Sequence, residues 1–583
     1  MTPHKDADPV YEKLKAVRKS KTVSLQPIEM FRREIVGLDG AVLPFTLRYY
    51  QVQAIYHLLA RKRMVLGDAA GSGKTISTLG GICYQWVKEP DNKVMIVTPK
   101  TALRQWEAEI HRFTQGVKVF VANGTPKQRY ETYLEFATHE GPEKPIMLLT
   151  YGSLTRDWHL DAHQPLLENG KPDPKQPLKP GRLDGITSKI KSLVTVFDEA
   201  QAFKSDRTKI WEVVSQLSGK SHRSYGLTAT LLGNDLMEGF FIFKAINPKV
   251  FGSTKTAFYN LFCHTQLQKI PGGRKVPIVV GYKNLELYRQ TLDPHFLGRH
   301  KHEISDELPT LITKEVSVPL DKIESLKYQE ALEGVVQLGD GEYKDFEETK
   351  ALTSLIYCQK AVDSLSLLKF NEDSEVFSDV FRDEVLNVKE IGSKEQALMD
   401  LLQDEFDGQK VIVYCRFASL IPRLQKLSDK IGIKSVAITG AVTDTKNNPA
   451  RRKAQEAFQN LKNDVKVVYI SDAASEAVNL QAASGLIFYN APWSWGRYVQ
   501  IVGRAIRIGS PHQHVLAIHL VAERPDADDP LTIDHYTLAT LQKKKSIIDK
   551  VLGESAQGAL DFDKGEGGSF ARQLARSLRK RNA

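Results

Sequence analysis

The sequence predicts an α/β protein with two units, each built on a parallel β-sheet covered by helices, and three observations predict this class. Short apolar runs alternate with amphipathic stretches after residue 43, and the same alternation returns after residue 410. Such runs are typical of strands that are buried on both faces of a parallel sheet. The chain has 583 residues, enough for roughly three to five folding units. A hydrophobic share of 42% excludes a disordered chain and a small disulfide-stabilised protein.

The strands and helices follow from this alternation in chain order. We expect strands at 64–66, 94–97, 146–149 and 193–197 in the first unit, and at 411–414, 435–439, 465–470 and 486–489 in the second. Helices are expected at 10–19, 420–430 and 450–461, and the middle of the chain is predicted to be mostly helical. The predicted organisation is an N-terminal extension (1–40), a first α/β unit (41–250), a helical protrusion and linker (251–385), a second α/β unit (386–530), and a final helix with a basic tail (531–583).

The charge and the cysteines restrict the setting of the protein. Lys and Arg number 80 against 70 Asp and Glu, so the formal net charge is +10 and the pI is near 9.0. This excess permits a polyanionic partner, although a solvated surface gives the same balance. The 4 cysteines lie far apart, and no apolar run reaches the roughly 18 residues that a membrane span needs. Because the start of the chain lacks a signal-peptide pattern, we expect a cytoplasmic protein.

A glycine-rich loop follows the first predicted strand. Residues 67–75 read Gly-Asp-Ala-Ala-Gly-Ser-Gly-Lys-Thr and lead into a helical pattern. A strand, such a loop and a helix in this order are typical of a site for nucleotide phosphates, with a purely structural glycine turn as the alternative. Gly71 and Gly73 let backbone N–H groups surround phosphate oxygens without a steric clash. Lys74 would reach the β- and γ-phosphates, and the Thr75 hydroxyl would hold Mg²⁺.

Two carboxylates end the predicted strand at 193–197. Asp198 would bind Mg²⁺, directly or through water, and Glu199 would orient and deprotonate the attacking water. By itself a strand that ends in Asp-Glu is a weak signal. Together with the phosphate loop it becomes the expected second half of an ATP-hydrolysing site.

Two arginines in the second unit are candidates for stabilising the transition state. Phosphoryl transfer needs a cation against the charge that develops at the γ-phosphate. Arg504 and Arg507 are three residues apart, so in a helix they would share one face. If the second unit docks on the first, both guanidinium groups reach the cleft in which ATP is hydrolysed. An ordinary pair of surface arginines is the alternative.

Together these segments resemble the SWI/SNF-type DNA translocases of helicase superfamily two, from about residue 43 to residue 552. The matching blocks occur in the family's order: the entry motif at 47–51, the phosphate loop at 68–75, motif Ia at 97–100 with Trp106, motif Ib at 149–152, motif II at 198–201, motif III at 226–230, motif V at 471–481 and motif VI at 500–509. Motif V is closest to the form of bacterial members. The resemblance implies two RecA-like lobes, a helix that braces them, and ATP-driven movement along duplex DNA.

The resemblance also implies which residues form the site. The nucleotide would be bound by Gln51, Asp68, Gly71, Ser72, Gly73, Lys74 and Thr75, with Gln51 at adenine and Asp68 at the place where the family's phosphate loop begins. Hydrolysis would be coupled to movement by Thr228, Thr230, Gln201 and Gln500. The sequence departs from the family's pattern at Gln201, where His is usual, at Ala477, where Gly is usual, and at Leu231, where Pro is usual. We expect Gln201 and Ala477 to affect coupling rather than family membership.

Contacts with DNA are predicted from the same motifs. A motor that steps along any sequence should hold phosphates, because base edges carry the sequence information. We therefore expect contacts from Thr98, Lys100, Thr150, Tyr151 and Ser471, with Arg416 and Lys204 as further candidates. Helix capping is the alternative for Thr98 and Thr150, and an ordinary surface charge is the alternative for Arg416 and Lys204.

The sequence thus predicts an ATP-hydrolysing translocase on double-stranded DNA that uses ATP and Mg²⁺ and displaces or remodels DNA-bound complexes. A strand-separating or branch-migrating helicase is the alternative among motor enzymes. An ATP-gated clamp, or a factor that acts on RNA polymerase, is the alternative outside them. We expect a monomer that does not associate with membranes.

Overall fold

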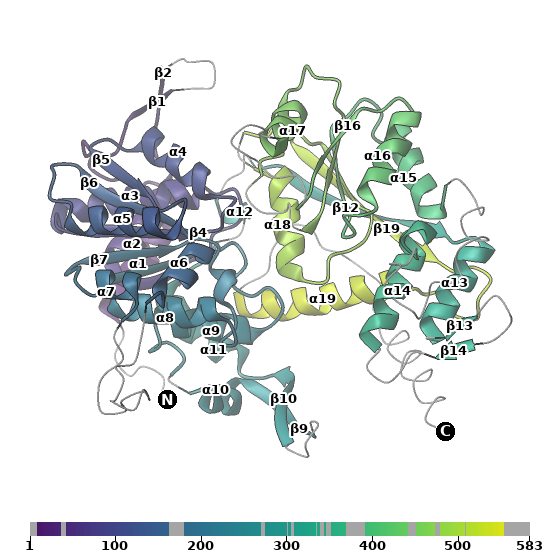
Figure 1. Ribbon diagram of the computed structural model, residues 1–583, viewed down its shortest axis with the longest axis horizontal. Helices are drawn as coiled ribbons and strands as arrows, with labels where there is room; N and C mark the ends of the chain where they lie inside the picture. Colours follow the sequence, from purple (N-terminus) through teal and green to yellow (C-terminus); the bar gives the residue numbers. More distant parts are fainter. Residues whose placement is uncertain are drawn as a thin grey trace. The chain divides into compact units, whose positions relative to one another are not determined.

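A computed structural model of the protein describes residues 8–36, 42–161, 180–252, 254–269, 275–299, 301–304, 308–333, 335–337, 343–345, 351–368, 391–440, 450–472, 478–507 and 509–552 (Figure 1). The chain divides after Ile304 into two compact units, and residues from Ile548 to the end of the last helix cluster with the first unit. Each unit contains a parallel sheet of its own. Within the described part of the chain, no helix combines the length and apolar character required to cross a lipid bilayer.

The first unit is built on a seven-stranded sheet with the order β11-β3-β8-β7-β4-β6-β5, in which every strand pair is parallel. Its strands are β3 (Arg63–Leu66), β4 (Lys93–Thr98), β5 (Val117–Val121), β6 (Lys144–Thr150), β7 (Leu193–Phe197), β8 (Arg223–Leu227) and β11 (Phe296–Leu297). The central strands β7 and β8 are buried along their whole length, because helices cover both faces of the sheet (Figure 1). The carboxyl ends of all these strands lie at one edge of the sheet.

The helices of the first unit connect these strands. They are α1 (Pro9–Lys19), α2 (Tyr49–Ala60), α3 (Lys74–Lys88), α4 (Leu103–Phe113), α5 (Pro126–Thr138), α6 (Tyr151–Trp158), α7 (Arg182–Thr187), α8 (Lys209–Lys220), α9 (Leu236–Ile246), α10 (Lys255–Phe262), α11 (Leu285–Leu292) and α12 (Lys301–Ile304), with 3₁₀ turns η1 (Ala200–Phe203) and η2 (Asp293–His295). Thr125 and Thr208 begin α5 and α8 by accepting backbone N–H groups. A buried bidentate ion pair, at 2.6 Å for both hydrogen bonds, joins Arg129 of α5 to Asp157 of α6.

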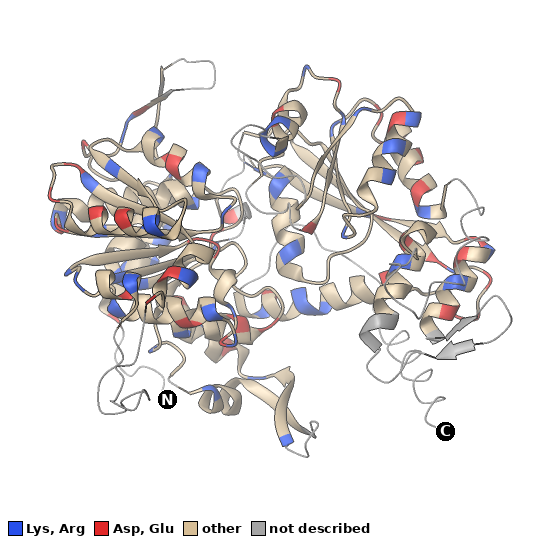
Figure 2. Ribbon diagram, viewed as in Figure 1, with Lys and Arg blue, Asp and Glu red and all other residues tan. Residues whose placement is uncertain are grey.

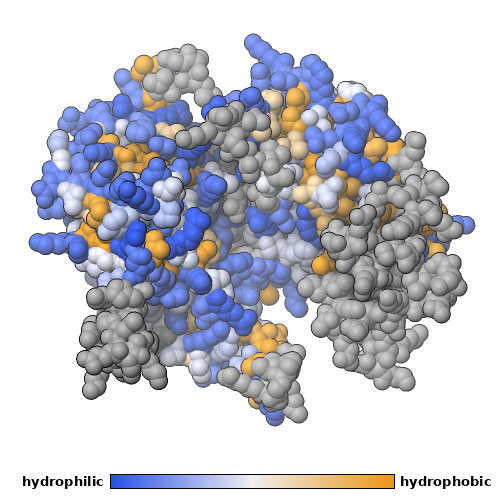
Figure 3. Space-filling view, in the orientation of Figure 1, coloured by the Kyte–Doolittle hydropathy of each residue, from blue (hydrophilic) through white to orange (hydrophobic). Residues whose placement is uncertain are grey.

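Two antiparallel hairpins also belong to the first unit. One pairs β1 (Glu34–Val36) with β2 (Val42–Pro44), and the other pairs β9 (Cys263–Lys269) with β10 (Lys275–Tyr282). The second hairpin exposes large apolar side chains, with Leu267 69% and Val280 51% exposed, and Figure 3 shows hydrophobic surface over it. In the register of this hairpin Lys275 lies opposite Lys269. Positive and negative side chains are mixed over the helices (Figure 2).

The second unit is built on a six-stranded sheet with the order β12-β19-β18-β15-β17-β16, again parallel throughout. Its strands are β12 (Thr310–Pro319), β15 (Val411–Tyr414), β16 (Ser435–Ile438), β17 (Val467–Ile470), β18 (Gly485–Phe488) and β19 (His514–Glu523). A small hairpin of β13 (Val335–Gln337) and β14 (Tyr343–Asp345) stands apart from this sheet. β15, β17 and β18 are buried along their whole length and form the centre of the core.

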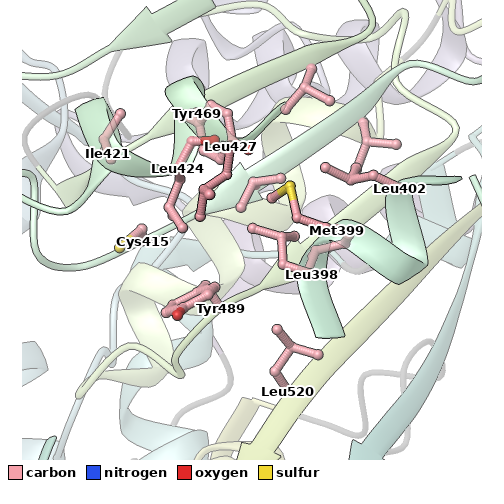
Figure 4. Packing of buried hydrophobic residues seen from close by; sticks show 14 of the residues in the cluster. Leu398, Met399, Leu402, Cys415, Ile421, Leu424, Leu427, Tyr469, Tyr489 and Leu520 are labelled. Atoms are coloured by element: carbon pink, nitrogen blue, oxygen red, sulfur yellow. Dashed lines mark hydrogen bonds between the residues drawn. The ribbon is translucent and has the colours of Figure 1, made fainter. Parts of the chain in front are cut away.

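Helices pack against this second sheet. They are α13 (Lys322–Glu333), α14 (Ala351–Asp363), α15 (Ser393–Gln403), α16 (Ile421–Lys430), α17 (Ala450–Gln459), α18 (Trp495–Ala505) and α19 (Ile533–Leu552), with the 3₁₀ turn η3 (Leu365–Leu368). Figure 4 shows the hydrophobic core on one face of the sheet, where Leu398 of α15 and Leu424 of α16 meet Tyr469 of β17. Burial of these apolar side chains holds α15 and α16 on the strands.

A cluster of buried charges fastens three helices of the second unit together. Lys394 of α15 is fully buried, and its ammonium group lies 3.1 Å from a carboxylate oxygen of Asp363 at the end of α14. The same group lies 2.6 Å from Asp534 in the first turn of α19. One ammonium group thus binds carboxylates of two other helices, so the start of α19 has a defined position on this unit.

The predicted α/β class with two parallel sheets is confirmed, and each expected strand is present within about two residues of its predicted bounds. The region 251–385 differs from the expectation of mostly helical structure. It contributes β11 to the first sheet and β12 to an edge of the second, so the two units adjoin in sequence near residue 304. A two-residue strand such as β11 is too short to show any periodicity. Ala477 and the basic tail after 552 lie outside the described residues.

Candidate ATP-binding and hydrolysis site

The phosphate loop connects β3 to α3 in the first unit. Gly71 and Gly73 have φ angles of +83° and +80°, a region that residues with a Cβ rarely adopt. At Gly73 a Cβ would also lie 2.7 Å from Nε2 of Gln51, so the end of that side chain would have to shift if the glycine were replaced. The chain therefore turns sharply into α3, whose first residue is Lys74 and whose N-terminal N–H groups are available to an anion.

Lys74 is held by the loop from which it projects. Its ammonium group donates to the carbonyl oxygens of Asp68, at 2.7 Å, and Ala69, at 3.1 Å. The ammonium group of Lys74 therefore satisfies two of its donors on carbonyl oxygens of the same loop. Ser72 is 2% exposed and belongs to the same turn, since its backbone N–H donates to the carbonyl of Ala69.

Gln51 lies directly against this loop. Its Oε1 accepts the backbone N–H of Arg48 and so caps the start of α2, at 3.0 Å. Its Nε2 points to the carbonyl oxygen of Ser72 at the longer distance of 3.5 Å. The end of the entry motif at 47–51 thus lies against the phosphate loop, and a role of Gln51 at adenine stays a prediction.

Asp68 is bound by a residue that the sequence analysis did not identify. Both of its carboxylate oxygens accept from the guanidinium group of Arg299, Oδ1 from Nε at 2.9 Å and Oδ2 from Nη2 at 2.5 Å. Both side chains are 2% exposed. The Asp68 side chain therefore faces Arg299, and its carbonyl is the part that faces Lys74. Arg299 follows β11, which has no sequence signal of its own.

Asp198 and Glu199 follow β7 at the same edge of the sheet. Oδ2 of Asp198 accepts from the indole N–H of Trp106, at 2.7 Å, and from the hydroxyl of Thr98, at 3.2 Å. Loss of hydration and the neighbouring Glu199 carboxylate raise the pKa of Asp198 to about 7, although the Trp106 N–H and the charge of Lys74 oppose the rise. A nearby cation would therefore stabilise the charged form of the Asp198 carboxylate.

Glu199 is connected by its side chain to the loop after β8. Its φ angle is +49°, an uncommon conformation for a residue with a side chain. Its Oε2 accepts from the amide of Gln201, at 2.5 Å, and Oε1 of Gln201 accepts from the hydroxyl of Thr228, at 2.8 Å. The Thr228 hydroxyl also accepts the backbone N–H of Thr230, at 2.9 Å. Gln201 therefore bridges motif II to motif III by hydrogen bonds.

Several predicted DNA contacts of the first unit are directed inward instead. Thr98 is fully buried and bonds to Asp198, and Tyr151 is 5% exposed and donates to the carbonyl of Asp198 at 2.6 Å. Burial raises the pKa of the Tyr151 hydroxyl well above its usual value. Thr150 caps α6 through its hydroxyl, which was the alternative reading for this residue. These hydrogen bonds give Thr98, Thr150 and Tyr151 partners within the first unit, and a DNA contact from any of them stays a prediction.

Lys204 and Lys100 are the remaining predicted DNA contacts of the first unit. Lys204 forms an ion pair with Glu238 at 2.6 Å, and that carboxylate also accepts backbone N–H groups from the loop before α9. The surface-charge alternative thus fits Lys204 better than a DNA contact. Lys100, two residues after β4, is exposed. It lies at the carboxyl edge of the sheet, the same edge as the phosphate loop.

The predicted residues of the second unit gather around α18. Arg504 is 6% exposed and donates to the carbonyl of Val478 at 3.2 Å. Arg507 follows the end of the helix at Ala505, so the two arginines do not share one helical face as expected. Gln500 is 7% exposed, and its Oε1 accepts from Arg497 at 3.2 Å.

Arg416 and Ser471 stand at the carboxyl ends of β15 and β17. Arg416 donates to the carbonyl of Ala491 and lies over the ring of Trp493, 4.8 Å from its centroid. These contacts hold the guanidinium group within its own unit, which does not favour a DNA contact. Ser471 is 2% exposed, and in the described part of the chain its hydroxyl has no hydrogen-bond partner.

Comparison with known proteins identifies the family. A family model described as the SNF2-related domain matches residues 50–367, more than half of the chain, and a second described as the helicase conserved C-terminal domain matches residues 393–509. The chain belongs to the SNF2-related family. Both domains are of the helicase-like ATPase class, so the predicted class of enzyme, an ATP hydrolase, is confirmed.

Individual relatives are distant and longer. An uncharacterized ATP-dependent helicase of Mycoplasma pneumoniae is 22% identical over 515 residues, which cover 87% of this chain and 42% of that protein. The SWI/SNF chromatin-remodeling complex subunit snf22 of Schizosaccharomyces pombe is 24% identical over 511 residues, 85% of this chain and 28% of that protein. The chain thus spans less than half the length of these relatives. The Sulfolobus solfataricus SWI2/SNF2 ATPase core in complex with dsDNA is 19% identical, with 95% of this chain and 98% of that chain covered, at a TM-score of 0.36, on which we base no argument.

Proposed function

We propose that the protein is an ATP-hydrolysing translocase on double-stranded DNA that displaces or remodels complexes bound to the DNA. The observation that carries this proposal is the hydrogen-bonded chain from Glu199 through Gln201 to Thr228. A motor needs a link between the group that acts on ATP and a structural element that can shift, and these hydrogen bonds link Glu199 to the loop after β8.

The first unit supports the ATP half of the proposal. On binding ATP, the ammonium group of Lys74 would exchange the carbonyls of Asp68 and Ala69 for phosphate oxygens. Glu199 would orient the attacking water and accept its proton. Mg²⁺ fits the donors at hand, because Thr75 supplies a hydroxyl and Asp198 supplies a carboxylate whose pKa is raised by burial and by the neighbouring Glu199 carboxylate, so that a cation there would stabilise its charged form. When bound, the metal would offset negative charge on the phosphates.

Arg504 and Arg507 are proposed to contribute to hydrolysis of the ATP that the first unit binds. Arg504 lies in the last turn of α18, and Arg507 lies two residues beyond the end of this helix. Their guanidinium groups would stabilise the charge that develops at the γ-phosphate.

Duplex DNA is proposed as the track. Lys100 is exposed at the carboxyl edge of the first sheet. Ser471 follows β17 at the carboxyl edge of the second sheet, and its hydroxyl, unlike those of Thr98 and Tyr151, has no hydrogen-bond partner within the described residues. Groups of this kind bind phosphate oxygens without reading sequence. The names of two relatives are consistent with a protein that acts on DNA, since one is named an ATP-dependent helicase and the other a chromatin-remodeling complex subunit.

The test combines two measurements on the same protein. ATP hydrolysis is measured on duplexes of increasing length, and displacement of a third strand from a triplex is measured beside unwinding of a forked duplex. A translocase hydrolyses ATP faster on longer duplexes and removes the third strand while leaving the fork paired. Lys74→Ala serves as the control that abolishes both signals.

The other outcomes each identify another activity. Efficient opening of the fork would replace translocation with strand separation. Hydrolysis that is independent of DNA length would favour a clamp, and stimulation by RNA polymerase rather than by DNA would favour a polymerase factor. Light scattering of the protein with and without DNA tests the expected monomer.

A further inference from the structure

Arg299 has four acceptors around one buried guanidinium group. Besides the two oxygens of Asp68, Nη2 donates to the backbone carbonyl of Tyr50 at 2.9 Å and Nη1 donates to Oε1 of Gln53. Residues 50 and 53 belong to α2, the helix that carries Gln51. One side chain therefore fixes the first part of the phosphate loop to the helix of the entry motif.

The backbone around Arg299 follows the phosphate loop as well. β11 pairs with the last residues of β3, and the pairing continues beyond the strands, since Gly67 N–H donates to the carbonyl of Leu297 at 2.7 Å. Ala69 N–H donates to the carbonyl of Arg299 at 3.0 Å. The ring of Phe296 closes against Gly67, where a Cβ would lie 2.2 Å from it. Residues 67–69 are thus held on one side by 296–299.

The same segment is anchored further along the chain. The Tyr49 hydroxyl, at the start of α2, lies 3.1 Å from the carbonyl oxygens of both Glu303 and Ile304. Arg18 of α1 donates to the carbonyl of Gly298 at 3.2 Å. The chain then leaves the first unit, and its next strand, β12, belongs to the second sheet.

We propose that Arg299 is a positioning residue for nucleotide binding, acting through Asp68. In the structure, the Asp68 carbonyl is the acceptor of Lys74, and ATP would take Lys74 away from it. The Asp68 side chain keeps both of its charged hydrogen bonds to Arg299 during that exchange. The loop therefore retains its shape while Lys74 moves to the phosphates.

This inference rests on the nucleotide-binding half of the proposed function. A bidentate arginine–carboxylate pair fixes distance and direction together, which a lysine does not. Removing either partner leaves an uncompensated charge in the interior, and the loop must rearrange to hydrate it.

The experiment is an equilibrium titration with a fluorescent ADP analogue, without DNA, so that neither hydrolysis nor DNA stimulation enters the result. The variants are Arg299→Gln, Asp68→Asn, both together, and Arg299→Lys. We expect each single variant to weaken the affinity for the analogue about 10- to 100-fold. If the two residues act together, the affinity of the double variant should lie within about threefold of the lower of the two single-variant affinities. Arg299→Lys is expected to lose about tenfold, because it retains the charge without the fork.

A matched control uses Arg63, a partly buried arginine at the other end of β3. Its guanidinium group bonds to Ser218 and to the carbonyls of Ser221 and Ile246, none of them near the phosphate loop. Arg63→Gln should lower the thermal unfolding midpoint but leave the affinity for the analogue as in the parent. If Arg299→Gln does not fold, Arg299→Lys decides.

Three results would overturn the inference. The first is a folded Arg299 variant whose affinity lies within twofold of the parent, which would make the pair merely structural. The second is a loss in the double variant that equals the product of the two single losses, about 10²- to 10⁴-fold, which would mean that the two residues act separately. The third is a parent protein that does not bind the analogue, and that result alone would also overturn the proposed function.

Discussion

Replacing Gln201 tests the link between the catalytic carboxylate and motif III. Gln201→Ala removes the amide that donates to Glu199 at 2.5 Å and accepts from Thr228 at 2.8 Å. A hydrogen bond to a charged group contributes about 1.5–3 kcal/mol, and each 1.4 kcal/mol in a barrier is tenfold in rate. We therefore expect kcat for ATP to fall by about 10- to 150-fold.

The KM for ATP should remain near the parent value, because neither partner of Gln201 belongs to the phosphate loop. Steady-state ATP hydrolysis with saturating duplex DNA measures both constants. Gln201→Glu keeps the shape but replaces the donor with a charge that repels Glu199, so it should lose as much as Gln201→Ala. Gln201→His retains a ring N–H and should lose least.

Gln105, an exposed residue of α4 that bonds to Glu109, offers a matched control, and Gln105→Ala should behave as the parent. The reasoning would be refuted if Gln201→Ala kept kcat within twofold of the parent while its unfolding midpoint was unchanged.

Three further predictions follow from the site and the core. Lys74→Ala should abolish nucleotide binding, whereas Glu199→Gln should keep binding and lose turnover, and the ADP titration with a hydrolysis assay separates the two. Tyr151→Phe removes a hydrogen bond of about 0.5–1.5 kcal/mol to the Asp198 carbonyl, so it should lower kcat severalfold. The affinity for DNA, measured by fluorescence anisotropy, should stay unchanged. Weaker DNA binding would show that the Tyr151 hydroxyl does more than hold the Asp198 backbone. Lys394→Met leaves Asp363 and Asp534 buried without their cation and should lower the free energy of unfolding by about 3–5 kcal/mol. Burial raises the pKa of Asp363 and the charge of Lys394 opposes that rise, so the pKa in the folded Lys394→Met variant should be higher still. The folded variant then gains more from protonation than the folded parent, and the difference in unfolding free energy should shrink from pH 8 to pH 5 in urea unfolding. A difference that grows on acidification would contradict the assignment.

The sequence was informative wherever a run of residues had a local physical reason for its structure. The strand before Asp198 is apolar over 193–197 and matches β7 residue for residue, because both of its faces are buried. The phosphate loop could be predicted from Gly71 and Gly73, since backbone conformation alone requires them. In the same way Gln201 could be singled out, because it departs from a recognisable pattern.

Other features depended on tertiary contacts that no local pattern records. The partner of Asp68 is Arg299, more than two hundred residues away, behind a strand of two residues. Thr98 and Tyr151 carry groups that suit phosphate binding, and only their burial shows that Asp198 is their partner. Arg507 was expected on a helix that ends two residues earlier, because Ile506 adopts an extended conformation.

The central claim is that ATP bound by the first unit is hydrolysed with the help of arginines from the second. It is tested most directly by single-turnover hydrolysis in the Arg504→Ala/Arg507→Ala double variant, with nucleotide affinity measured on the same sample. We predict that the affinity stays within a few-fold of the parent while the rate of hydrolysis falls on the order of 10³-fold or more. Hydrolysis at the parent rate by a folded double variant would contradict the account.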